Sequence, residues 1–157
     1  MLYHDRTLQR SIPIIRNIQM NSELAMHNDV WLVYDGECPV CATYSHYIRI
    51  RKTVGRLHLI DARHASPLLT EITQAGLDID QGMVVKFKDA IYYGPDAIHI
   101  LTLLSSPSDL FNRINFYCFR TRTGARILYP VAKACRTVLL KLLGISYIDN
   151  LNKNQHR

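Results

Sequence analysis

The pattern of apolar and polar positions predicts an early strand followed by a helix. The run VWLVY at 30–34 is rich in valine and aromatic residues and closes with Asp35-Gly36, which is typical of a buried strand and its exit turn. The segment 38–53 has a proline near its start and basic residues near its end, which favours a helix. Its apolar spacing predicts a core-facing stripe formed by Val40, Tyr44, Tyr47 and Ile48.

The middle of the chain continues this alternation. RLHLIDA at 56–62 predicts a second strand, and SPLLTEITQAG at 66–76 predicts a helix with a serine N-cap and a glycine stop. GMVVKFKDAIYYG at 82–94 predicts a β-hairpin. A third helix is expected to open at Pro95-Asp96, with Asp96 capping its positive end.

The last third of the chain predicts two more helices. LFNRINFYCFRT at 110–121 is amphipathic, and Gly124 introduces a final helix over Ala125–Leu143. Its apolar stripe is continuous, and we expect it to dock on its own domain, with a membrane surface or a partner protein as the alternative. The stripe consists of Ile127, Leu128, Val131, Ala132, Cys135, Val138, Leu139 and Leu142.

Strand, helix, strand, helix, hairpin and helix is the order of the thioredoxin-like α/β fold. A βαβ unit followed by ββα, with two cysteines at the first strand-to-helix junction, completes that pattern. We therefore predict one thioredoxin-like domain at 29–144 with C-terminal helices, after an N-terminal extension at 1–28 and before a polar tail at 145–157.

Composition narrows the class of protein. The chain has 157 residues, of which 48% are hydrophobic and 20% charged, as expected of one globular domain. The sequence shows neither the run of about 20 apolar residues that crosses a bilayer nor a secretory signal, so we expect a cytoplasmic protein. In a reducing cytosol, a C-x-x-C pair is more often catalytic or metal-binding than structural.

Most of the net charge of +6 lies in the C-terminal third. Between Pro107 and Gly144 there are seven cations and one acid, Asp109. We expect a solvated basic face, while an acidic protein or a lipid headgroup is the alternative partner. No motif for nucleic acid is present, so binding of nucleic acid is not expected.

The pair Cys38 and Cys41 is open to redox chemistry, metal binding or an inert role, and the sequence favours redox chemistry. A cysteine at a helix start meets free N–H groups and the positive end of the dipole, which lower its pKa. Cys38 is therefore the expected exposed attacker, and the more buried Cys41 resolves the mixed disulfide. Zinc is disfavoured because no second cysteine or histidine pair supplies the remaining ligands.

The acids beside the pair leave two interpretations open. Nearby negative charge from Asp35 and Glu37 raises a thiol pKa. Asp35 is either a general base that exchanges protons with Cys41 or a turn acid that shapes the loop.

The motif DGECPVC at 35–41 is similar to the signature of the DCC family of predicted thiol-disulfide oxidoreductases. LIDAR at 59–63, GMVVKFKDAIYYGPDAI at 82–98 and YPVAKACR at 129–136 also resemble family blocks, in the same order. The resemblance covers roughly 30–144 and matches Arg136 to a recurring arginine. Two positions depart from expectation: Cys135 stands where the family usually has asparagine, and Met83 where thioredoxins have a cis-proline.

Together these patterns predict a thiol-disulfide oxidoreductase. Its substrate is a protein or small-molecule disulfide, and no cofactor is expected beyond an external thiol such as glutathione or a thioredoxin system. The competing hypothesis is a non-catalytic protein that uses its basic C-terminal region to bind a membrane or an acidic partner. Besides Cys38, Cys41 and Asp35, the predicted site includes supporting residues, with Met83 and Val84 facing the pair. The supporting residues are Gly36, Pro39, Met83, Val84, Asp96 and Arg136.

Overall fold

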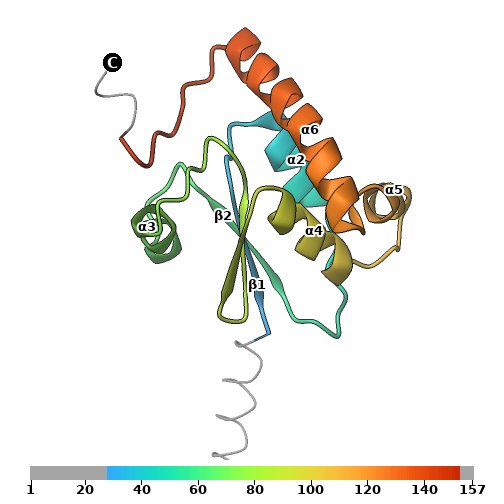
Figure 1. Cartoon of the computed structure of the whole chain (residues 1–157). Coiled ribbons are helices and arrows are strands. Elements are labelled where there is room, and N and C mark those ends of the chain that lie inside the picture. Colours follow the sequence, from blue (N-terminus) through green and yellow to red (C-terminus); the bar gives the residue numbers. More distant parts are fainter. Residues whose placement is uncertain (1–27, 153–157) are drawn as a thin grey trace, which may run out of the picture.

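The computed structural model describes residues 28–152, which form a four-stranded sheet with helices on both faces (Figure 1). The strand order is β2-β1-β3-β4; β1 pairs parallel with β2 and antiparallel with β3, and β3 and β4 form the predicted hairpin. The strands are β1 (Val30–Tyr34), β2 (Leu57–Asp61), β3 (Val84–Phe87) and β4 (Ala90–Tyr93).

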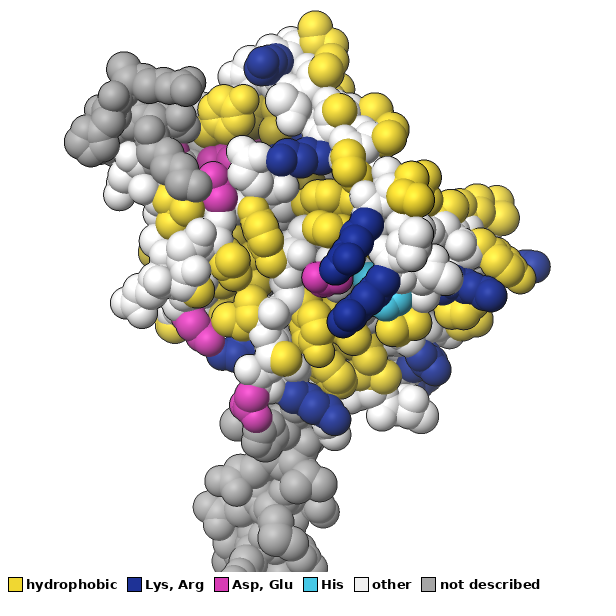
Figure 2. Space-filling model, in the orientation of Figure 1, with side chains coloured by type: hydrophobic (Ala, Val, Ile, Leu, Met, Phe, Trp, Pro, Cys, Tyr) yellow, Lys and Arg dark blue, Asp and Glu magenta, His cyan; other side chains and the backbone are white. Residues whose placement is uncertain are grey.

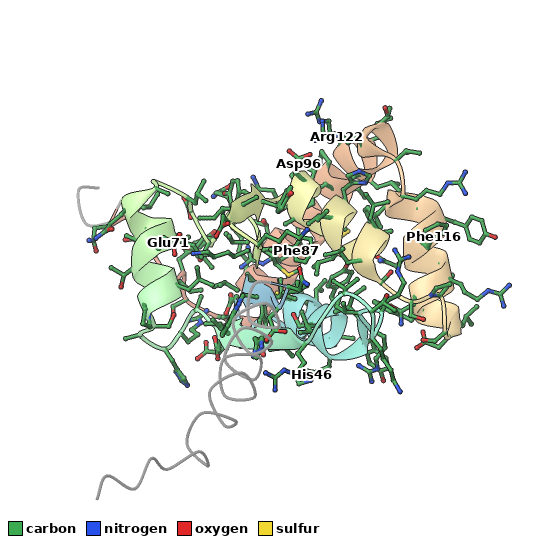
Figure 3. The ribbon with its side chains drawn as sticks, turned by 90° about the horizontal axis from the view of Figure 1, so that it is seen from below. His46, Glu71, Phe87, Asp96, Phe116 and Arg122 are labelled. Atoms are coloured by element: carbon green, nitrogen blue, oxygen red, sulfur yellow. The ribbon has the colours of Figure 1, made fainter. Side chains whose placement is uncertain are left out.

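The helices divide between the two faces of the sheet. Helix α3 covers one face, while α2, α4 and α6 lie over the other, with α5 at their side (Figure 1). Figure 3 shows the same division, with Glu71 of α3 on one side and Asp96 of α4 and Phe116 of α5 on the other. The arrangement confirms the predicted thioredoxin-like α/β fold. The helices are α2 (Pro39–Tyr47), α3 (Pro67–Gln74), α4 (Pro95–Leu104), α5 (Leu110–Phe119) and α6 (Arg122–Leu143).

Strand β1 is central because its alternate side chains pack into two separate hydrophobic cores, one on each face of the sheet. Leu32 and Tyr34 face α2 and α4, whereas Val33 faces α3, as the two-residue period of a strand requires. Leu32 and Val33 are both fully buried, which explains why the run is apolar without interruption. Each face of the sheet therefore has its own packed layer. The end of β1 is held firmly where residues 35–38, which we call the cysteine loop, begin.

Helix α2 differs from its predicted length and orientation. It ends at Tyr47, and Val40 and Tyr47 are largely exposed, while Cys41, Ser45 and Ile48 are buried. Of the predicted stripe, Ile48 is buried and Tyr44 packs against the core, while the assignment of Val40 and Tyr47 to the core was wrong. Since Cys38 and Cys41 join the core below α2, the helix turns its cysteine side inward and carries Val40 outward.

Helix α6 begins earlier than predicted and presents a different face to the protein. Thr121 is its N-cap, and Gly124 lies inside the first turn, where a Cβ would lie 2.7 Å from the Cys118 carbonyl oxygen. The residues that α6 buries are Ala125, Arg136 and Leu140, so the predicted docking of the whole apolar stripe was wrong. No described helix is long and apolar enough to cross a membrane.

The segment after α6 packs against the body of the protein up to the last residue described. The Asn150 side chain donates to the Leu77 carbonyl (2.9 Å) and accepts from the Ile79 N–H (3.0 Å). Ile148 packs against the core on the α3 side of the sheet. Residues 145–152, which the sequence assigned to a polar tail, thus bridge α6 to the loop before β3. The predicted N-terminal extension at 1–28 lies outside the described residues except for residue 28.

A fully buried asparagine fixes α5 to the end of α2. The Asn112 amide nitrogen donates to the Tyr47 carbonyl (3.1 Å), and its oxygen accepts from the Arg49 N–H (3.1 Å). The same amide nitrogen also donates to Asp109, the N-cap of α5. One side chain therefore satisfies the backbone where α2 ends.

We expect Asn112→Ala to lower the free energy of unfolding by about 2–3 kcal/mol, because it strands buried hydrogen-bonding groups and leaves a void. Urea unfolding followed by circular dichroism measures the loss. The control is Ile114→Ala on the same helix, which is 55% exposed and should change stability by less than about 0.5 kcal/mol. Equal losses for the two variants would contradict this role.

Candidate active site

Parallel pairing brings the carboxyl ends of β1 and β2 together at the start of the cysteine loop. The Gly36 N–H donates to Asp61 Oδ1 (3.0 Å), and the same oxygen accepts the Arg63 N–H (2.9 Å). A Cβ at Gly36 would lie 2.1 Å from Asp61 Oδ2. Glycine is therefore needed here because the loop passes directly over the end of the neighbouring strand.

Cys38 is the N-cap of α2, and Pro39 occupies the first helical position as predicted. The Cys38 sulfur accepts a hydrogen bond from the Cys41 N–H at 3.4 Å, in the place that a capping oxygen usually takes. Both thiols are free and buried, with Cys38 0% and Cys41 6% exposed. The expectation of an exposed Cys38 was wrong, because the side chain points under α2 into the core rather than out of the loop.

The pKa values of the two thiols are shifted in opposite directions. A hydrogen bond from the Cys41 thiol is the main cause that lowers the pKa of Cys38 to about 6, and the Cys41 N–H and the Arg136 charge act in the same direction against burial. The shared hydrogen bond and burial raise the pKa of Cys41 well above that of a free thiol. The pair therefore holds one proton at neutral pH, with a Cys38 thiolate beside a Cys41 thiol.

Asp35 lies between two guanidinium groups. Its Oδ1 accepts from Arg63 Nε (2.9 Å) and its Oδ2 accepts from Arg136 Nη2 (3.2 Å). Asp35 and Arg136 are both buried, whereas Glu37, which also pairs with Arg63, is exposed. The carboxylate thus anchors both arginines at the cysteine loop; whether Asp35 also carries a proton for Cys41 stays a prediction.

Arg136 reaches the site from α6 and contacts three parts of it. Besides Asp35, it donates through Nη1 to the Asp80 carbonyl, and its charge acts on both cysteine sulfurs. Burial works against this charge, but Cys41, Cys38 and Asp35 outweigh it and raise the pKa of Arg136. Its Nε is buried without a hydrogen-bond partner among the described residues. The side chain that the family resemblance singled out therefore lies in the centre of the site.

The loop that receives Arg136 is itself held by the end of the chain. The Asp80 carboxylate is buried and accepts from the backbone N–H groups of Ile148 (3.0 Å) and Asp149 (2.7 Å). Since Asp80 also offers its carbonyl to Arg136, the segment after α6 fixes the acceptor that positions this guanidinium.

A cavity of about 240 Å³ opens beside Cys41. Its walls are mainly apolar and come from α2, the loop before β3, α4, α5 and α6, while Asp35, Arg136 and Lys133 supply the charged groups. The hydroxyl of Tyr129, on α6, donates to the Gln81 carbonyl (3.1 Å) and closes one side of the cavity. The lining residues are Asp35, Val40, Cys41, Tyr44, Ile79, Gln81, Gly82, Met83, Ile98, Phe119, Tyr129, Ala132, Lys133 and Arg136.

Three of the predicted supporting residues, Met83, Val84 and Asp96, lie in different parts of the structure. Met83 packs with both cysteines and lines the cavity, as expected. Val84 faces α3 on the other side of the sheet, because neighbouring strand residues point to opposite faces; the expectation that it faces the pair was wrong. Asp96 makes no capping hydrogen bond, and Gly94 is the N-cap of α4, so Asp96 contributes only its charge to the first turn.

Sequence reasoning missed Arg63, Asp80 and Tyr129. For Arg63 a signal existed, because it follows the second strand just as Asp35 follows the first, and parallel strands end at the same edge. Tyr129 and Asp80 carry no local pattern, since their roles depend on where α6 crosses the sheet. Among residues 28–152, no three metal-binding side chains lie together.

Replacing Asp35 should lower the free energy of unfolding far more than replacing the exposed Glu37. Asp35→Asn leaves the buried Arg136 without its carboxylate, and we expect a loss of about 3–5 kcal/mol in unfolding free energy. Glu37→Gln removes an exposed partner of the same Arg63 and should cost less than about 1 kcal/mol. Urea unfolding of both variants, with Cys38 and Cys41 reduced, makes the comparison. A small loss for Asp35→Asn would show that Arg136 does not depend on this pair.

The stability of the reduced protein should rise with pH above about 6. Because the folded-state pKa of Cys38 is depressed to about 6, its thiolate contributes stability that is present above the unfolded thiol pKa and is lost as pH falls through 6. We expect a slope of up to about 1.4 kcal/mol per pH unit between these limits. The raised pKa of Cys41 acts only at higher pH, outside this window.

The measurement is urea unfolding at a series of pH values, compared with Cys38→Ser. The difference between the two proteins reports the cysteine pair, because every titrating group other than Cys38 and the Cys41 bonded to it is unchanged. Parallel curves for the two proteins would show that no thiolate forms at Cys38.

Comparison with known proteins gives one match. A model of the DCC1-like thiol-disulfide oxidoreductase family matches residues 32–142, which is more than half of the chain. The match begins within β1 and includes the cysteine loop, the other three strands and nearly all of α6. No curated protein and no solved structure matches the chain. The predicted family and enzyme class are thereby confirmed. The chain belongs to the DCC1-like thiol-disulfide oxidoreductase family and is an oxidoreductase.

Proposed function

We propose that Cys38 and Cys41 are the redox pair that carries the thiol-disulfide exchange of this family. The observation that supports this most directly is the paired acidity of the two thiols. The pKa of Cys38 is lowered to about 6, so its thiolate is present at neutral pH, while a proton stays on Cys41. Thiolate is the nucleophile in disulfide exchange, and a resolving thiol must stay protonated until it is needed.

The exchange proceeds in two displacements. The Cys38 thiolate attacks one sulfur of a substrate disulfide, forms a mixed disulfide and releases the other substrate sulfur as a thiolate. Cys41 then loses its proton and attacks the Cys38 sulfur, which releases the second substrate thiol and leaves a Cys38–Cys41 disulfide. The substrate gains two electrons, and an external thiol such as glutathione or a thioredoxin returns the protein to its dithiol form.

The surrounding charges bear on both displacements. The charge of Arg136 acts on both sulfurs. It stabilises the Cys38 thiolate before this thiolate attacks the substrate. It stabilises the same thiolate again when a partner thiol reduces the Cys38–Cys41 disulfide and releases the Cys38 sulfur. A stabilised thiolate favours the dithiol over the disulfide and makes the disulfide a stronger oxidant. Asp35 holds Arg136 in this position, and we retain proton exchange with Cys41 as its second proposed role.

Access to the sulfurs limits which disulfides can react. Cys38 is fully buried and Cys41 nearly so, and the cavity is lined by Cys41 but not by Cys38. We propose that the substrate disulfide approaches through this cavity, whose side chains shift to expose the Cys38 sulfur. A small or extended disulfide fits such an approach better than one embedded in a folded surface.

The proposal is tested by trapping the mixed disulfide. Cys41→Ser removes the resolving sulfur, so a covalent adduct with a model disulfide peptide should accumulate on Cys38 and survive until a reductant is added. Mass spectrometry after acid quenching detects the adduct. Cys38→Ser should form little adduct, because Cys41 remains buried below α2 and burial still raises the pKa of its thiol.

All of these variants should carry Cys118→Ser and Cys135→Ser, because Cys135 is exposed and would itself capture disulfides. The protein with Cys38 and Cys41 intact in this background should turn over the substrate without accumulating an adduct. A stable adduct on Cys41 in the Cys38→Ser variant would reverse the proposed roles.

A further inference from the structure

The outer face of α6 is apolar although it faces away from the protein. Ile127, Val131, Val138 and Leu142 are 57% to 79% exposed, and their spacings of four, seven and four residues put them on one stripe. The residues that α6 buries lie on the opposite side of the helix. A surface helix normally exposes polar residues on its outer side. Because this apolar stripe faces away from the protein, it does not take part in packing the core.

Helix α5, which packs against α6, repeats this arrangement. Leu110, Ile114 and Tyr117 are 55% to 72% exposed and recur at spacings of four and three residues, while Asn112 and Asn115 are buried on the other side. Figure 2 shows hydrophobic side chains along α6 and around α5, with lysine and arginine side chains on the same view. We call seven of the exposed apolar residues on the two helices the outer α5–α6 face: Leu110, Ile114, Tyr117, Ile127, Val131, Val138 and Leu142.

The charge around this face is mainly positive, and its nearest acid in the chain is Asp109, the exposed N-cap of α5 beside Leu110. Residues 110–148 contain no aspartate or glutamate. Arg136 is buried in the active site, but the other arginines of α5 and α6 are exposed. The exposed cations of the two helices and their junction are Arg113, Arg120, Arg122, Arg126 and Lys141.

We propose that the outer α5–α6 face docks on an anionic lipid surface. A helix whose exposed side combines an apolar stripe with adjacent cations lies in the plane of a membrane interface, with the stripe among the acyl chains and the cations at the headgroups. Five exposed cations against the one acid at the N-cap of α5, Asp109, match a negatively charged surface. A second copy of this chain would instead bring two cationic faces together.

Docking would also set the position of the active site. Helix α6 carries the exposed stripe on one side and Tyr129, Ala132 and Arg136, which line the cavity, on the other. The cavity beside Cys41 would then lie about one helix diameter, ~10 Å, from the lipid. The proposal does not depend on the redox chemistry, because none of the docking residues lines the cavity.

The test is sedimentation of the full chain with two kinds of vesicles. We expect binding to vesicles of phosphatidylcholine with phosphatidylglycerol, and at least about tenfold weaker binding to phosphatidylcholine alone. Binding to the anionic vesicles should fall steeply as salt is raised. A protein with Cys38→Ser and Cys41→Ser should bind equally well, which separates docking from catalysis.

Two pairs of substitutions address the two parts of the interaction. Val131→Gln with Val138→Gln removes apolar area and should weaken binding by about tenfold or more, while Arg126→Gln with Lys141→Gln should weaken binding to anionic vesicles by about five-fold per charge. All four residues are exposed, so folding should be preserved, and circular dichroism verifies this. The matched control is Leu59→Gln with Lys88→Gln, which changes an exposed apolar residue and an exposed cation on the sheet instead.

Several outcomes would overturn the proposal. They are equal binding to neutral and anionic vesicles, no binding to either, and equal loss for the control pair. Binding to polyglutamate without binding to vesicles would point to an acidic protein partner instead. Dimers in light scattering that disappear with Val131→Gln and Val138→Gln, again without vesicle binding, would assign the face to a second copy of the chain.

Discussion

The buried ion pair between Arg136 and Asp35 joins the last helix of the chain to the loop that carries the cysteines. A buried charge is expensive unless it is paired and hydrogen-bonded, and here each partner has more than one neighbour. Asp35 accepts from Arg63 as well, and Arg136 also donates to the Asp80 carbonyl. The contacts come from β1, β2, the loop before β3, and α6, so the site exists only when all four are in place.

The same guanidinium links the fold to the chemistry. Arg136 stabilises the Cys38 thiolate, and its guanidinium is held by Asp35 on one side and by the Asp80 carbonyl on the other. The Asp80 loop is in turn fixed by the backbone that follows α6. Thiol acidity in this protein is therefore a property of how α6 and its C-terminal extension sit on the sheet, in addition to the capping of α2 by Cys38.

Local signals were enough to predict the strands, the hairpin and the start of α2. Each depends on neighbouring residues: an uninterrupted apolar run for β1, a proline at the first helical position for α2, and a strand period for β3 and β4. The position of Cys38 at the helix start followed from the same logic. The burial of Cys38 could not be predicted from neighbouring residues, because it depends on which other elements of the fold cover the loop. Val84 was misassigned by a single residue, which in a strand is enough to reverse the face.

Helix α6 shows why side-chain pattern alone misjudged the C-terminal third. Valine and isoleucine suggest a buried face, and an arginine suggests an exposed one, yet α6 buries Arg136 and exposes Val131 and Val138. The reversal has a physical cause. Asp35 and the cysteine thiolate present negative charge at the end of the sheet, and a helix crossing there must bring a cation to it. Once Arg136 fixes the rotation of α6 about its axis, residues half a turn away must point outward whatever their polarity. The exposed apolar stripe is thus a geometric consequence of the active site. Because its residues are valine, isoleucine and leucine rather than polar, the stripe is suited to contact with a second, apolar surface.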